Sequence, residues 1–258
     1  MELSGKVALV TGGGRGIGES TALKLAASGA DVVVSARTGS EIAAVADRVR
    51  ELGRRAHAVS ADVADRAACD ALYREAVARM GKVDILVNNA GIYHLAPIDR
   101  ETDEDWHRVL AVNLHSAFYL TRAVFPAMRE RGWGRIVNVA STSSVKGTAE
   151  ESAYTASKHA LLGLTRCVAL EAAPCNVTVN AVCPWFVDTP LVRGFVQREA
   201  ERTGESAEAI WKRLEAMNPQ GRMITAEEVG DLIAFLCSEG ARSITGQGII
   251  VASGHYTF

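Results

Sequence analysis

Short runs of Val, Ile and Leu alternate along the chain with longer, alanine-rich segments whose apolar residues recur at helical spacing. The short runs are apolar at nearly every position, as in a parallel strand that is covered on both faces. The longer segments have the length that a crossover helix between parallel strands needs. The pattern therefore predicts an α/β fold in which helices cover both faces of a parallel sheet.

We predict a Rossmann-like, doubly wound sheet of seven strands. The strands are expected at Val7–Val10, Val32–Ser35, His57–Ser60, Ile85–Asn88, Arg135–Val139, Thr178–Val182 and Ile249–Val251. The chain has 258 residues and no repeat, low-complexity tract or linker, so residues 1–258 are expected to form one domain.

Two further segments are expected to be helical. Residues Thr102–Arg131 begin with a capping-type Thr102-x-x-Asp105 and continue at helical spacing as one long helix. Residues 189–222 form the largest irregular insertion and are the candidate substrate lid. Within it, Arg198–Met217 has helix-forming composition, either as a mobile cover over a pocket or as a fixed surface helix or subunit contact.

Composition narrows the classes of partner. The 28 basic and 30 acidic residues give a net charge of -2, which offers no basic field for nucleic acid or an anionic membrane. No export signal opens the chain and no apolar run approaches membrane-spanning length, so a cytoplasmic protein with a small-molecule substrate is expected. The five cysteines contain no C-x-x-C pair and are expected to be reduced core thiols.

A glycine-rich turn directly follows the first predicted strand, from Thr11 to Gly18. Gly12, Gly16 and Gly18 let the backbone come close to a pyrophosphate, and Arg15 and Ile17 lie in the same turn. The N–H groups at the start of the following helix can hold this anion. Such a turn can also be purely structural, but its position after strand one favours dinucleotide binding.

The end of the second predicted strand indicates which dinucleotide binds. An NAD site usually has a carboxylate here, whereas this chain has Ala36 and Arg37. Arg37 and Arg15 supply guanidinium groups suited to a 2'-phosphate, so NADPH is predicted over NADH. The alternative is that both are ordinary surface arginines.

Residues after the third and fourth strands extend this predicted site. Asp62 and Val63 are expected to meet the adenine, although Asp62 could equally cap a helix. Asn89, Ala90 and Gly91 are small or amide-bearing residues that allow close approach to the cofactor.

Tyr154 and Lys158 lie one helical turn apart, thirteen residues after Ser141. At this spacing an ammonium can lie beside the phenol and favour its ionised form, so that the tyrosine can exchange a proton at neutral pH. An isolated pair of this kind is more often an ordinary helix surface. Together with the glycine turn and Ser141 it predicts nicotinamide chemistry on a carbonyl or alcohol, without a metal.

These motifs together resemble the short-chain dehydrogenase/reductase family over essentially the whole chain: the turn at Thr11–Gly18, Asn-Asn-Ala-Gly at 88–91, Asn113, Ser141 and Tyr154-x-x-x-Lys158. The resemblance implies that Tyr154 is the general acid and that Ser141 polarises the carbonyl. It implies that Lys158 binds the nicotinamide ribose and lowers the pKa of the tyrosine, while Asn113 holds a water in a proton relay. It also implies a homotetramer, and cofactor contacts at Pro184, Val187 and Thr189.

Two departures from the family pattern affect the substrate end. Trp185 replaces the usual glycine after the sixth strand, which predicts a narrowed or ring-stacking pocket unless the ring turns outward. The chain ends in His255-Tyr256-Thr257-Phe258, where His255 approaches a neighbouring site or terminates the sheet. The pocket is expected to be lined by Tyr93, His94, Ser143, Glu150 and Trp185.

Several stretches look like bacterial polyketide ketoreductases and 3-oxoacyl carrier-protein reductases, among them Gly134–Thr142 and Asn180–Pro184. A ketone, either free or bound to a carrier protein, is therefore the favoured substrate. The 3-hydroxybutyrate dehydrogenases look similar around Thr189-Pro190-Leu191, and a sugar or cyclic alcohol is a further alternative. A non-catalytic NADP-binding sensor is the alternative outside enzymes, although the intact catalytic quartet makes it unfavoured.

Overall fold

The computed structural model describes residues 2–256, in which seven parallel strands form one sheet in the order β3-β2-β1-β4-β5-β6-β7. The strands are β1 (Val7–Thr11), β2 (Asp31–Ala36), β3 (Ala56–Ser60), β4 (Ile85–Asn88), β5 (Gly134–Val139), β6 (Val177–Pro184) and β7 (Gly248–Val251). Strand order reverses between β1 and β4, which pair in parallel from Ala8 to Val10. The predicted Rossmann-like, seven-stranded parallel sheet is therefore confirmed.

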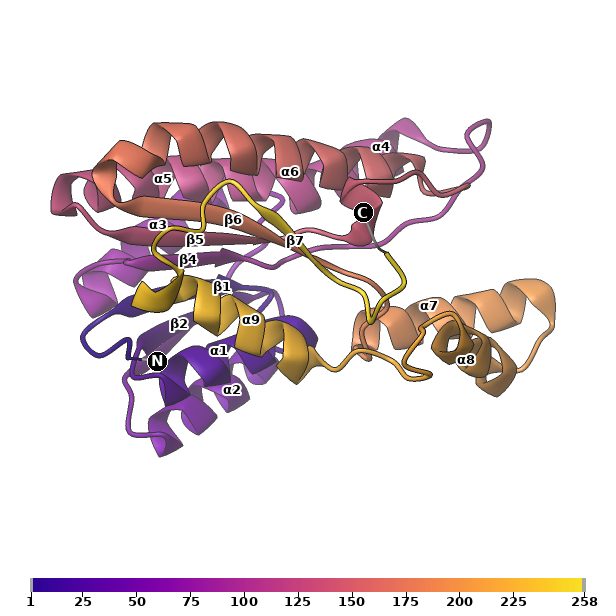
Figure 1. Cartoon of the computed structure of the whole chain (residues 1–258), viewed down its shortest axis with the longest axis horizontal. Helices are drawn as coiled ribbons and strands as arrows, with labels where there is room; N and C mark the ends of the chain where they lie inside the picture. The colour runs from indigo at the N-terminus through magenta and orange to yellow at the C-terminus, as the bar shows by residue number, and fades with distance from the viewer. Residues whose placement is uncertain (1, 257–258) are drawn as a thin grey trace.

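Helices cover both faces of the sheet (Figure 1). One face carries α1 (Gly16–Ala27), α2 (Gly39–Glu51) and α9 (Ala226–Cys237), and the other carries α3 (Arg66–Met80), α4 (Asp103–Leu110), α5 (Ser116–Arg131) and α6 (Ser152–Ala172). Two further helices, α7 (Pro190–Thr203) and α8 (Ala207–Ala216), project beyond the sheet. They lie next to the edge at which the parallel strands end.

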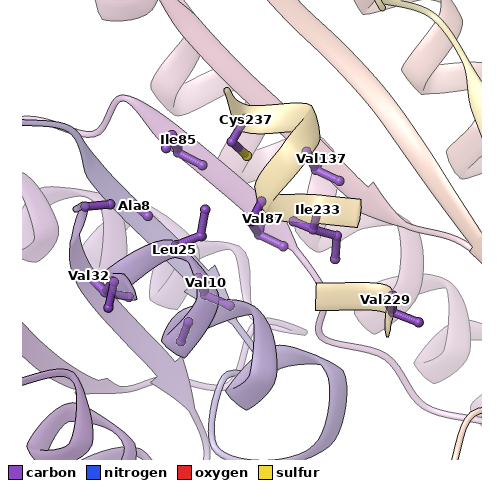
Figure 2. Close-up of a cluster of buried hydrophobic side chains, with 14 of the residues drawn as sticks. Ala8, Val10, Leu25, Val32, Ile85, Val87, Val137, Val229, Ile233 and Cys237 are labelled. Atoms are coloured by element: carbon purple, nitrogen blue, oxygen red, sulfur yellow. The ribbon is translucent and has the colours of Figure 1, made fainter. Parts of the chain in front are cut away.

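Successive residues of each central strand enter two separate cores. Ala8 and Val10 of β1 pack with α1 and α9, whereas Val7 and Leu9 pack with α3 and α5. Figure 2 shows the first core, where Val229, Ile233 and Cys237 of α9 lie over the strands. Because both faces are buried, the strands show no alternation of polar and apolar residues, which is why short apolar runs located them.

The long predicted helix is interrupted in its hydrogen bonding. Thr102 caps it as expected, since its Oγ1 accepts a hydrogen bond from the Asp105 backbone N–H at 3.1 Å. A π-helical turn, η1 (Ala111–His115), then separates α4 from α5. Asn113 lies within this turn, a type of irregularity that is frequent at functional sites.

Two other expectations are corrected. The predicted helix Arg198–Met217 is two helices, because α7 ends at Gly204, whose φ of +77° continues no right-handed helix. The cysteines are all free, but only Cys69, Cys183 and Cys237 are buried, while Cys167 is exposed and Cys175 intermediate. The prediction of five core thiols was therefore wrong for Cys167, whereas Cys175 is partly buried and packs against the core.

Candidate active site

A cavity of about 290 Å³ lies at the carboxyl ends of the central strands. Its walls come from the loops after all of the strands β1 to β6, together with the first turns of α7. The reversal of strand order between β1 and β4 lies at the same edge. Open α/β sheets bind their ligands at such a switch point, outside the carboxyl ends of the strands.

The glycine turn forms one end of this cavity. Gly12 and Gly16 have φ values of +61° and +58°, which an L side chain rarely adopts. The start of α1 has no side-chain cap, so its first N–H groups are left to bind an anion. Gly18 does not line the cavity, and a Cβ there would lie 2.2 Å from the Gly12 carbonyl oxygen. Its role is to let the turn pack closely.

Asn89 fixes the loop after β4 against this turn. Its Nδ2 donates to the carbonyl oxygens of Thr11 and Gly12, at 2.8 and 3.0 Å. Apart from Gly18, every residue that we predicted for the dinucleotide lines the cavity. The lining includes Gly12, Arg15, Gly16, Ile17, Arg37, Asp62, Val63, Asn89, Ala90, Gly91, Tyr154, Lys158, Pro184, Val187 and Thr189. The residues present thus fit a dinucleotide whose pyrophosphate faces the turn.

The part of the cavity lined by residues after β2 holds both basic and acidic side chains. Arg15 and Arg37 line it as predicted, and Arg37 is exposed. Glu41, which sequence reasoning missed, also lines it and lies 3.5 Å from the Arg15 guanidinium. Asp62 does not cap α3; its Oδ1 accepts from the Ala64 backbone N–H, and Asp65 is the cap.

Ser141, Tyr154 and Lys158 meet on the wall formed by β5 and α6. Ser141 follows β5 and caps the short turn η2 (Thr142–Ser144), where its Oγ accepts from the Ser143 N–H at 3.1 Å. On α6, the Lys158 Nζ lies 5.7 Å from the centroid of the Tyr154 ring. That Nζ donates to the Val139 carbonyl oxygen at 2.8 Å. The predicted trio therefore shares one cavity wall.

Burial shifts the pKa values of both Tyr154 and Lys158 on this wall. Burial raises the pKa of Tyr154 to about 12, against the opposing effect of a hydrogen bond with Ser141, and the charge of Glu151 raises it further. Burial lowers the pKa of Lys158 to about 8. Lys158 is not among the groups that shift the phenol, so the prediction of a lowered tyrosine pKa is wrong for this structure. Tyr154 therefore holds its proton at neutral pH.

Asn113 lies behind the cavity wall. Its Oδ1 accepts from the Ile92 N–H at 2.8 Å, and its Nδ2 donates to the Ile92 carbonyl and to Ser157 Oγ. A Cβ on Gly91 would lie 3.5 Å from Asn113 Oδ1 and 3.7 Å from Lys158 Nζ. Asn113 therefore fixes the loop after β4 beside Lys158, while its predicted water relay stays a prediction.

The substrate end departs from expectation at two positions. Tyr93, Ser143 and Trp185 line the cavity, but His94 and Glu150 do not. The His94 Nε2 lies 3.2 Å from a Glu101 carboxylate oxygen, which turns the ring away from the cavity. Glu150 is exposed and its carbonyl oxygen accepts from the Ala96 N–H, so its role is to hold the loop after β4.

Glu151 occupies the place that we predicted for its neighbour. It is 7% exposed and lines the cavity. Its Oε1 accepts from the Tyr93 hydroxyl at 2.7 Å, and its Oε2 accepts from Ser143 Oγ at 3.0 Å. The pair of glutamates before α6 was the available signal, but spacing alone could not tell which one faces inward.

Trp185 lines the cavity and also contacts the C-terminal segment. Its ring stacks on His255 with centroids 4.7 Å apart, and the Lys146 ammonium lies 4.2 Å from its centroid. His255 Nδ1 contacts the Met217 carbonyl oxygen at 2.9 Å, so this residue joins the end of the α7–α8 segment rather than the sheet. Thr257 and Phe258 lie outside the described residues.

Residues 2–256 contain neither a membrane-spanning helix nor a cluster of metal-binding side chains. No helix there has the length and apolarity needed to cross a membrane. No group of three or more His, Cys, Asp or Glu side chains within the same range is arranged to hold a metal ion.

Comparison with known proteins identifies the chain's family. The family model described as short chain dehydrogenase matches residues 6–200. The chain is 42% identical over 245 residues to the D-beta-hydroxybutyrate dehydrogenase of Cupriavidus necator, covering 95% of each protein. It is 43% identical over 251 residues to the monensin polyketide synthase putative ketoacyl reductase of Streptomyces virginiae, covering 96% of each.

A solved structure agrees with these matches. The crystal structure of a variant actinorhodin polyketide ketoreductase with NADPH has a TM-score of 0.93 and 37% identity, with 99% of each chain covered. The protein is thus a member of the short-chain dehydrogenase/reductase family, whose oxidoreductases typically use NAD(P) to interconvert alcohols and carbonyl compounds.

Proposed function

We propose that the protein is an NADPH-dependent reductase that converts a ketone into a secondary alcohol. The observation that carries this proposal is the Tyr154 phenol, which lines the same cavity as Ser141 and Lys158. When bound, the dinucleotide supplies the hydride. Tyr154 donates its proton to the carbonyl oxygen, and the Ser141 hydroxyl orients that oxygen by hydrogen bonding. The fold contributes positioning and electrostatic stabilisation.

The choice of NADPH rests on the charges at the end of β2. Arg37 lines the cleft where an NAD site usually places a carboxylate, and Arg15 lines the same cleft. Replacement Arg37→Asp should lower the ratio of NADPH to NADH catalytic efficiency by about 10- to 100-fold, since a hydrogen bond to a charged group contributes about 1.5–3 kcal/mol. Arg100→Asp makes the same charge change at an exposed position outside the cavity and should leave the ratio unaltered. Equal use of NADH by the unmodified protein would contradict the choice.

Polyketide or 3-oxoacyl ketones are the first substrate class to assay, because relatives at 36–43% identity carry the names ketoacyl reductase or 3-oxoacyl-[acyl-carrier-protein] reductase. Thioester-linked 3-ketones would test carrier-bound substrates. A small hydroxy acid is the second candidate, favoured by the relative named D-beta-hydroxybutyrate dehydrogenase. Loss of NADPH absorbance with any ketone separates an enzyme from a non-catalytic sensor.

Residues 189–222 are proposed as the substrate lid. Phe195 of α7 supports this, because it lines the cavity from the segment that projects beyond the sheet. The tetramer, the single-domain organisation and the cytoplasmic location stay predictions.

A further inference from the structure

Glu151 is a buried carboxylate without a cationic partner. Among residues 2–256, no Lys, Arg or His nitrogen lies within the 4.0 Å of an ion pair with it. Its two hydrogen bonds come from the neutral hydroxyls of Tyr93 and Ser143. An ionised carboxylate offers about four acceptor positions, so about two remain for a ligand in the cavity. Burying such a group without a counter-charge is unfavourable, which makes this wall of the cavity receptive to a cation.

The basic side chains in and near the cavity do not pair with Glu151. Arg15 and Arg37 lie at the dinucleotide end. The Lys158 ammonium donates to the Val139 carbonyl, and Glu151 is not among the groups that shift its pKa. Lys146 lies over the Trp185 ring but does not line the cavity. The negative charge of Glu151 therefore faces the substrate end uncompensated.

Aromatic rings surround the same end. Tyr93 makes edge-on contacts with the rings of Tyr154 and Phe195, with centroids 4.9 and 5.6 Å apart. Phe195 in turn stacks against Phe186 at 6.1 Å. All four side chains line the cavity with Glu151. A group of aromatic rings beside a carboxylate is the chemistry that recognises alkylated ammonium groups, through cation–π attraction and charge pairing.

We propose that the substrate of this protein is a ketone bearing a positively charged ammonium group, which Glu151 and the rings of Tyr93, Phe186 and Phe195 bind beside the reacting carbonyl. The identity of the reaction rests on the proposed function, whereas the binding of the ammonium group does not. The same charge repels a free carboxylate, so this inference separates the protein from enzymes of small hydroxy acids.

Two ketones of one shape and a third with a negative charge test the proposal. They are (2-oxopropyl)trimethylammonium, its neutral counterpart 4,4-dimethylpentan-2-one, and acetoacetate. The unmodified protein with NADPH should show a kcat/KM for the cation at least about tenfold above that for the neutral ketone, and acetoacetate should be the poorest substrate. A longer pair, with three methylene groups between carbonyl and nitrogen, covers a greater separation between Tyr154 and Glu151.

Substitutions at the adjacent residues Glu150 and Glu151 test whether Glu151 causes the preference for the cationic ketone. Glu151→Gln keeps the side-chain shape and removes the charge, and it should reduce the cation-to-neutral ratio of kcat/KM at least about tenfold. Any change in the protonation of Tyr154 acts on both ketones alike and cancels in this ratio. Glu150→Gln removes the same charge from the exposed neighbour outside the cavity and should keep the unmodified ratio. A ratio near one in the unmodified protein, or one that Glu151→Gln leaves intact, overturns the proposal.

Binding without turnover distinguishes the two proposals. Calorimetric titration of the trimethylammonium ketone into the protein saturated with NADP⁺ should give a Kd at least about tenfold lower than for Glu151→Gln. If no ketone is reduced but this difference is present, the proposed function fails and the ammonium site stands. If ketones are reduced but the titrations are identical, the ammonium site fails and the proposed function stands.

Discussion

The two ends of the cavity are built in different ways. The dinucleotide end is made largely of backbone, from the contiguous turn Thr11–Gly18 and the loop that Asn89 holds against it. The substrate end is made of side chains from four separate segments, among them Tyr93, Glu151, Trp185 and Phe195. A backbone site is specified by local sequence and has no room for added atoms. A side-chain site depends on distant segments and can change its ligand without changing the fold.

The largest expected effect lies where the two ends meet, at Tyr154. Tyr154→Phe removes the proton donor and should lower kcat by about 10²- to 10⁴-fold, the usual contribution of a general acid. NADPH binding, followed by fluorescence titration, should be retained, because the turn and the loop are untouched. Tyr73→Phe removes a hydroxyl from α3, outside the cavity, and is the matched control. Retention of full turnover by Tyr154→Phe would show that the proton comes from elsewhere.

A second substitution tests whether the dinucleotide end tolerates an added atom. In Gly18→Ala the new Cβ would lie 2.2 Å from the Gly12 carbonyl oxygen and 2.4 Å from Asn89 Nδ2, so the turn must shift. Overpacking of this kind costs about 1–3 kcal/mol, and we expect a loss of about tenfold or more in NADPH affinity. Denaturant unfolding and titration measure the two effects.

Gly39→Ala is the control for that substitution. Nothing lies within 4 Å of a Cβ at Gly39, the first residue of α2, so the change should leave stability equal or up to about 1 kcal/mol higher. Equal losses in both variants would contradict close packing as the cause of the effect at Gly18.

The pH dependence of reduction tests the buried wall between the two ends. Because burial lowers the pKa of Lys158 from 10.5 to about 8, its ammonium is present below pH 8 and is lost as the pH rises. We expect kcat/KM to fall about tenfold per pH unit above that point, whereas Tyr154 holds its proton until about pH 12. In Lys158→Arg the guanidinium stays charged, so the remaining activity should lose this descending limb.

The same shift has a consequence for stability. Between pH 8 and 10.5 the unfolded chain binds a proton at Lys158 that the folded chain does not. This group therefore makes the free energy of unfolding rise with pH over that window.

In the activity measurement, a decline of kcat/KM that still begins at pH 8 in Lys158→Arg would assign the loss of activity to another group.

The sequence predicts the sheet well because β1, β2, β4, β5 and β6 are buried almost throughout, and a short apolar run is then a clear signal. It predicts the dinucleotide end equally well, since Gly12, Gly16 and Arg37 act through local positions next to strands. The break between α7 and α8 at Gly204 was visible as a glycine, but it was outweighed by helix-forming neighbours on both sides. The π-helical turn at Asn113 has no such marker.

The substrate end was harder to predict because side-chain direction there depends on long-range contacts. Glu150 and Glu151 are adjacent, and a hydrogen bond between the Ala96 N–H and the Glu150 carbonyl fixes the loop so that the second one faces inward. His94 turns away because Glu101 lies 3.2 Å from its Nε2. Burial also raises the pKa of Tyr154, and the helical spacing between Tyr154 and Lys158 gives no information about burial.

The smallest predicted effect concerns Trp185, where the substrate end meets the C-terminal segment. Trp185→Gly removes a ring that lines the cavity, so bulkier ketones should gain up to about tenfold in kcat/KM relative to small ones. The KM for NADPH should change less, because the glycine turn lies at the other end. His255→Ala keeps the indole and removes only its stacking partner at 4.7 Å. If His255→Ala alone reproduces the change in preference, then the position of the C-terminal segment, rather than the bulk of the indole, sets the size of the substrate end.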